Sequence, residues 1–211
     1  MAQSRELRGL VIVEILAIVG LAFVPLPAIV PVAVPLLVLA SLSRWTRGRD
    51  WGELFHGGLR ATIVGATAGI VGLALALAIG TPLVEHVTDR AVEWSMYTLV
   101  RGNASQLFAV AIYVAVTSLA AELALRGWIV ERVLELASGR PGVTVLAILI
   151  GSAAEMIVTP GNFAMRAGAG LFGAGLGMMY VAGNRSIVAP ICARMAFALG
   201  ALMLESMKLV G

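Results

Sequence analysis

The feature that most restricts how this chain can fold is a series of long apolar stretches with almost no charge. Residues 9–42 contain one charged side chain, Glu14, and residues 61–84 and 102–121 contain none. About 20 apolar residues are enough for a helix to cross the hydrocarbon core of a bilayer. We therefore predict an all-α, polytopic transmembrane helix bundle, because helices satisfy their own backbone hydrogen bonds in lipid.

The overall composition excludes several other classes of protein. Of the 211 residues, 60% are hydrophobic and 13% are charged, whereas about a quarter of an average soluble domain is charged. The net charge is only +3 and the basic residues are scattered, so we expect contact with the lipid bilayer and no nucleic-acid partner. The single cysteine, Cys192, cannot form an internal disulfide, which excludes a secreted disulfide scaffold.

Prolines and polar turns divide the chain into about seven predicted spans. Pro25 and Pro27 are expected to break the first stretch, because proline removes an amide donor and clashes with the preceding turn. This break gives helices near 9–24 and 28–43, and one long kinked helix over the same residues is the alternative. The later predicted spans lie near residues 61–84, 102–121, 141–154, 167–184 and 186–204.

We expect one membrane domain made of two regions of sequence. Residues 1–103 would form N-terminal membrane helices together with two surface segments, 51–60 and 82–101, which mix charged and aromatic side chains. Residues 104–206 would form the remaining core helices. The first of these helices is predicted to run on beyond its uncharged part, toward Leu136.

The distribution of Lys and Arg predicts the orientation, because cytoplasmic loops of membrane proteins carry an excess of basic residues. With the N-terminus inside, nine basic residues face the cytoplasm and four face outward. We therefore expect an integral protein of the bacterial inner (plasma) membrane with a cytoplasmic N-terminus. The nine are Arg5, Arg8, Arg44, Arg47, Arg49, Arg60, Arg132, Arg140 and Arg185, and the four are Arg90, Arg101, Arg166 and Lys208.

Five ionisable residues fall inside the predicted spans, where a charge costs about 2.5–3.5 kcal/mol on insertion scales and needs a partner or a function. Glu122 and Arg126 lie four residues apart with Glu first, which is the favourable order for an ion pair on one helix face. Glu14 lies one turn into its span, where its side chain can reach toward the interface, and we assign it no role. The five are Glu14, Glu122, Arg126, Glu155 and Arg194.

The segment around Glu122 and Arg126 resembles a known motif. Its sequence, AELALRG over residues 121–127, is similar to the first motif of the CPBP intramembrane metalloproteases, which is Glu-Glu-x-x-x-Arg and is often followed by Gly. These are the CAAX-protease and bacteriocin-processing group, also called the Abi family. Further similarities follow in the family's order at residues 139–142, 160–162, 172–177 and 189–191. The resemblance covers residues 104–204 and implies a CPBP-like helical core with a polar chamber between helices.

At the positions that match the family's motifs, the chain lacks the residues that the family uses for catalysis. Ala121 stands where the family has a water-activating Glu, and Glu155 and Arg194 stand where it has metal-binding histidines. Ala198 replaces the Asn or Asp of the third motif. The retained Glu and Arg of the first motif resemble structural residues. In motif order, the positions are Ala121, Glu122, Arg126, Glu155, Arg194 and Ala198.

This set of residues is a poor metal site. A catalytic metal needs about three protein ligands, usually His or carboxylate, and Glu122 and Glu155 supply two at most. Arg126 and Arg194 cannot bind a cation, because an arginine does not lose its proton. We therefore expect no zinc and no other cofactor. A metal-free acid–base pair of the two carboxylates is the alternative, although the arginines would hold both of them.

The resemblance also implies a specific contact. Glu155 and Arg194 match two family residues that meet at one metal, so we expect them to face each other and form an ion pair. Glu122 and Arg126 would form a second structural pair, and the two pairs can join in one network.

Three functions remain open. The first is a catalytically inactive family member that binds a membrane protein or peptide as a scaffold, assembly factor or complex subunit. The second is a divergent but active intramembrane peptidase. The third is a small transporter with Glu155 and Arg194 lining its path, although no inverted repeat is visible between the two halves of the chain.

Overall fold

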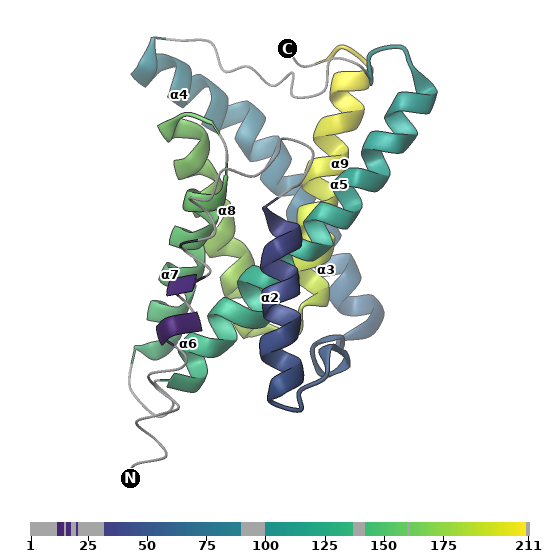
Figure 1. Ribbon diagram of the computed structural model, residues 1–211. Coiled ribbons are helices and arrows are strands. Elements are labelled where there is room, and N and C mark those ends of the chain that lie inside the picture. The colour runs from purple at the N-terminus through teal and green to yellow at the C-terminus, as the bar shows by residue number, and fades with distance from the viewer. Residues whose placement is uncertain are drawn as a thin grey trace. The chain divides into compact units, whose positions relative to one another are not determined.

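The described part of the chain consists of helices joined by turns, with no strand (Figure 1). This computed structural model describes residues 12–14, 16–17, 20, 32–89, 100–136, 142–159 and 161–209. The all-α fold class predicted from the apolar stretches is therefore confirmed. The expected break at Pro25 and Pro27 and the turn at residues 139–141 lie outside the described residues.

Three of the described helices are long and apolar enough to cross a membrane. They are Gly58–Val87, Ala104–Glu135 and Val188–Ser206, and two shorter apolar helices cover Val34–Thr46 and Val143–Val158. Apolar helices of this length would contact lipid, as expected of an integral membrane protein.

Helix α2 (Ala33–Thr46) begins and ends later than the span predicted near 28–43. Pro35 is its third residue, and a proline is tolerated there because amide groups of the first turn have no partner within the helix. A 3₁₀ turn, η1 (Trp51–Leu54), follows α2 within the predicted surface segment 51–60.

The next three segments form one continuous helix: α3 (Gly58–Leu75), the π turn η2 (Ala76–Gly80) and α4 (Thr81–Thr88). This helix is longer than the predicted span 61–84, and its last turns include the start of the expected surface segment. Pro82 would clash with the preceding turn of a regular α-helix. The wider π turn just before it lets the helix continue.

A second continuous helix also contains three segments: α5 (Ala104–Ala124), the π turn η4 (Leu125–Val130) and α6 (Glu131–Leu136). The extension toward Leu136 predicted from the sequence is thus present. Residues 122–134 are buried without interruption, so the charged second half of this helix packs inside the protein.

The last three described helices lie close to the last three predicted spans. They are α7 (Val143–Val158), α8 (Phe163–Ala182) and α9 (Val188–Ser206). The side chain of Asn162 caps α8 by accepting a hydrogen bond of 3.0 Å from the amide of Met165. Such a cap satisfies one of the free amides at a helix N-terminus, which explains why the chain turns at Asn162.

The chain divides into two compact units, each built from separate stretches of sequence. The first unit contains Met1–His56 and Ala120–Ile187, and the second contains Gly57–Leu119 and Val188–Gly211. Each unit therefore takes residues from both sides of residue 103. Helix α5 begins in the second unit and ends in the first.

The core of the first unit forms where α2, η4 and α7 meet. Leu36 and Ala40 of α2 belong to the same buried cluster as Leu125, Trp128 and Ala154. Within this unit α7 and α8 pack side by side (Figure 1).

The second unit is built on close packing of α3 against α9. A side chain added at Gly65 or Gly69 would overlap the backbone carbonyls of Ala189 or Ala193. Small residues let two membrane helices approach to this distance, so both glycines are required by the packing of this unit.

Candidate functional site

Arg126 is the centre of a buried polar cluster in the first unit. Its Nη1 donates hydrogen bonds to Glu122 Oε1 at 3.1 Å and to Glu155 Oε2 at 2.6 Å. Its Nη2 donates to the carbonyl oxygen of Gly173 at 2.8 Å. The side chain of Arg126 is fully buried. One guanidinium group therefore joins the end of α5, the end of α7 and the middle of α8.

The helices bring these groups together for simple geometric reasons. Glu122 and Arg126 are four residues apart, so they share a helix face, and Glu155 lies in the last turn of α7. A Cβ at Gly173 would lie 2.9 Å from Arg126 Nη2 and 3.1 Å from Glu155 Cβ. The absence of a side chain at this position leaves room for the guanidinium beside α8.

The residues present do not fit the catalytic zinc that the family resemblance implies. Glu155, at the position of a family histidine, accepts a 2.6 Å hydrogen bond from a guanidinium that stays positively charged. A dication in this place would be repelled by Arg126. Among the residues that the structure describes, no group of three or more His, Cys, Asp or Glu side chains could hold a metal ion.

The other positions predicted from the motifs lie in different surroundings. Ala121 is half-buried and packs against the core cluster around Leu125. Arg194 and Ala198 lie on α9, which belongs to the second unit. Glu155 and Arg194 thus belong to separate units, and the ion pair expected between them stays a prediction.

A segment that makes up just under half of the chain is similar to a known protein family. Residues 103–200 match the family described as "Type II CAAX prenyl endopeptidase Rce1-like". We refer to residues 103–200, which are similar to this family, as the Rce1-like segment. The match confirms the resemblance to CAAX proteases seen in the motifs, and it covers the Arg126 cluster. No curated protein and no solved structure matches the chain.

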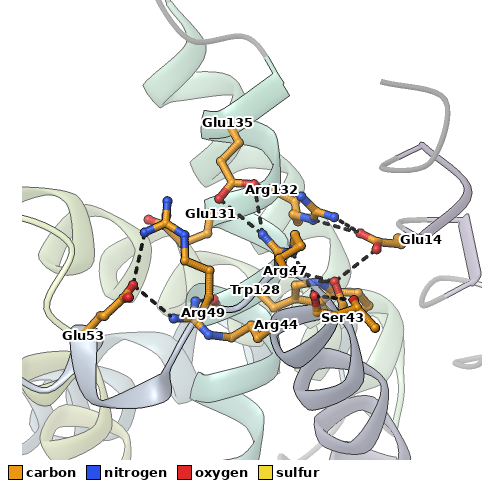
Figure 2. A network of polar contacts seen from close by, with 12 residues as sticks. Glu14, Ser43, Arg44, Arg47, Arg49, Glu53, Trp128, Glu131, Arg132 and Glu135 are labelled. Atoms are coloured by element: carbon orange, nitrogen blue, oxygen red, sulfur yellow. Dashed lines mark hydrogen bonds and ion pairs between the residues drawn. The ribbon is translucent and has the colours of Figure 1, made fainter. Parts of the chain in front are cut away.

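A second polar cluster joins the Rce1-like segment to the N-terminal region (Figure 2). Arg47 Nη1 donates to both oxygens of Glu135, at 3.3 and 3.1 Å, and Arg132 Nη1 donates to Glu135 Oε2 at 2.8 Å. Arg132 also donates to Glu14 through Nε and Nη2, at 2.8 and 2.5 Å. Ser43 completes the network, because its hydroxyl donates to Glu14 at 3.1 Å and accepts from Arg47 at 3.3 Å. We call these five residues the ionic ring.

Arg44 lies close to the ionic ring and is also buried. Its guanidinium stacks on the Trp51 ring at 4.7 Å from the centroid and donates to the carbonyl of Gly127 at 3.3 Å. The distribution of basic residues predicts that Arg44 and Arg132 lie in cytoplasmic loops, but both side chains are buried in the first unit. Their carbonyl and carboxylate partners offset the loss of water.

The groups around Arg47 shift its pKa in opposite directions. Burial lowers its pKa, and the positive charge of Arg132 acts in the same direction, while the carboxylates of Glu135 and Glu14 raise it. An arginine stays protonated at neutral pH despite such effects, so Arg47 remains a positively charged member of the ionic ring.

Glu14 is the functional candidate that sequence reasoning missed. The sequence assigns it no role, yet it accepts hydrogen bonds from Arg132 and Ser43. A lone carboxylate in a long apolar stretch was the available signal, since such a group needs a partner. Its partner Arg132 is 118 residues away, and no local pattern connects the two.

Proposed function

We propose that this Rce1-like chain is catalytically inactive and works by binding a membrane protein or peptide, as a scaffold, assembly factor or complex subunit. The observation that carries the proposal is the buried ion pair between Arg126 and Glu155, with a distance of 2.6 Å. The guanidinium of Arg126 competes with a metal ion or a water proton for this carboxylate.

The neighbouring motif position supports the same conclusion. General acid–base catalysis needs an ionisable side chain within hydrogen-bonding reach of the reacting water. Ala121 offers a methyl group where the family has its water-activating Glu. The remaining carboxylate of the motif, Glu122, contacts Arg126 at 3.1 Å and therefore already acts as a structural partner.

A peptidase assay tests the catalytic part of the proposal. The purified chain is incubated with a prenylated peptide that ends in a CAAX sequence, which is the substrate class named by its family. We expect no cleavage. Cleavage that is lost in Glu122→Gln or Glu155→Gln, but kept in the surface control Glu53→Gln, would overturn the proposal in favour of a divergent peptidase.

Co-purification tests the binding part. The tagged chain is isolated from its native membrane in mild detergent, and the bound proteins are identified by mass spectrometry. We expect one membrane protein at a fixed ratio to the chain, absent from a parallel isolation of an unrelated helical membrane protein. Isolation of the chain alone, without a partner at fixed ratio, would contradict a scaffold role.

A further inference from the structure

Glu14 contacts Arg132 and Ser43 of the first unit, to which it also belongs, as a bound carboxylate ligand would. Its Oε2 accepts from Arg132 Nε at 2.8 Å and from Nη2 at 2.5 Å, and its Oε1 accepts from Ser43 Oγ at 3.1 Å. Both oxygens are thus used, and the donors come from two different helices. Arginine donates in a planar fork that suits a carboxylate.

Arg132 is held in place by groups other than Glu14. Its Nη1 donates to Glu135 Oε2 at 2.8 Å, and Glu135 accepts two further hydrogen bonds from Arg47. The side chain of Arg132 is only 2% exposed. The nitrogens Nε and Nη2 are therefore fixed in the direction that Glu14 occupies.

The hydroxyl group of Ser43 is also oriented by groups other than Glu14. A hydroxyl group has one proton to donate and two lone pairs that accept. Trp128 Nε1 donates to Ser43 Oγ at 3.0 Å, and Arg47 Nη2 donates to it at 3.3 Å. Both lone pairs are occupied, so the single proton is directed at Glu14. Two separate parts of the protein thus direct their remaining donors at one point.

Charge favours an anion at this point. Without Glu14, the ionic ring would contain the two guanidinium groups of Arg47 and Arg132 and the single carboxylate of Glu135. The ring would then carry one excess positive charge, shared by Arg47 and the buried Arg132, where screening by water is weak.

We propose that Arg132 and Ser43 form a carboxylate-binding site, that Glu14 occupies it as an internal ligand, and that it binds a free carboxylate once Glu14 is removed. An acidic side chain of the membrane partner would then compete with Glu14 for the same donors. This last step rests on the proposed function, whereas the site itself rests on the contacts above.

Rescue by acetate tests the site. The full chain carrying Glu14→Ala is purified in detergent, and its Tm is measured at pH 7 in sodium acetate and in sodium chloride of equal ionic strength. Acetate is ionised at this pH, as carboxylates of its type are. We expect the variant to have a lower Tm than the unmodified chain in chloride. Acetate should restore at least half of this loss with a saturable dose dependence, and it should leave the unmodified chain unchanged.

Two control variants separate a specific site from a general salt effect. Glu53→Ala removes a carboxylate that is about half exposed and pairs with Arg49 at 3.2 Å and with Arg44 at 3.8 Å. Acetate should not raise its Tm. Glu14→Ala combined with Arg132→Gln should lose the response to acetate. An equal acetate effect in Glu14→Ala and Glu53→Ala, or no effect in either, would overturn the proposal.

A second readout applies if the Glu14→Ala variant folds poorly. If Glu14→Ala is aggregated in chloride, the yield of monodisperse protein purified in acetate replaces the Tm, with acetamide as the uncharged control. Equal yields in acetate and acetamide would then overturn the site. No partner enters this experiment, so its failure is separate from a failure of the proposed function.

Discussion

Removal of Arg126 should be among the most destabilising single changes in the chain. Arg126→Met deletes three hydrogen bonds, at 3.1, 2.6 and 2.8 Å, and leaves Glu122 and Glu155 buried without this guanidinium. Breaking a buried ion pair by removing one partner costs about 3–5 kcal/mol. We expect the free energy of unfolding to fall by about this amount, because both carboxylates lose the same partner.

The assay is reversible unfolding in mixed micelles, followed by circular dichroism, with two comparison variants. Arg49→Met removes an ion pair of 3.2 Å on the surface, and such pairs contribute about 0–1 kcal/mol. A triple variant with Met at residues 122, 126 and 155 removes all three charges at once. It should be milder than the single change, because apolar replacement of buried charges that pair with one another is often neutral.

Two results would contradict this reasoning. A loss in Arg126→Met no larger than that in Arg49→Met would mean that the buried cluster contributes little to stability. A triple variant less stable than Arg126→Met would mean that the carboxylates do not depend on this guanidinium, and that another group compensates their charge.

Four further predictions concern packing, metal, orientation and coupling. In thermal unfolding, Gly173→Ala should destabilise the protein by about 1–3 kcal/mol, because its Cβ would lie 2.9 Å from a buried guanidinium nitrogen. The control Gly175→Ala meets nothing within 4 Å and should be neutral or stabilising by up to about 1 kcal/mol. Purified protein should contain no stoichiometric zinc by elemental analysis, and chelators should leave its Tm unchanged; about one zinc per chain would contradict the inactive assignment. A phosphatase reporter fused to Gly211 should be active on the outer side of the membrane, and cytoplasmic reporting would mean that the number of spans is even. A double-mutant cycle on Glu155→Gln and Arg194→Met should show coupling above about 0.5 kcal/mol, and simple additivity would exclude their ion pair.

Local pattern was enough to predict much of the fold. The apolar stretches gave the helices, and the four-residue spacing of Glu122 and Arg126 anticipated their contact, because both depend on residues close in sequence. Helix ends were less predictable. Helix α2 begins at Ala33, after the predicted start near residue 28, and the π turn before Pro82 keeps α4 continuous with α3.

Long-range contacts could not be read from the sequence. The sequence marked Glu155 as a buried charge but could not show that Arg126, 29 residues away, would reach it together with Glu122. Nor could it show that Arg132 would supply the partner of Glu14. Such contacts depend on how helices pack, and no periodicity or spacing records which helices become neighbours.

The separation of Glu14 from Arg132 has a consequence for how the protein is made. Synthesis proceeds from the N-terminus at about 5–20 residues per second, so the 118 residues between them take about 6–24 s to be added. Throughout this interval the first apolar segment is available to the membrane while the arginine that neutralises its carboxylate does not yet exist. The ionic ring can close only after α6 has been made, so the carboxylate of Glu14 has no Arg132 to pair with while the intervening residues are being synthesised.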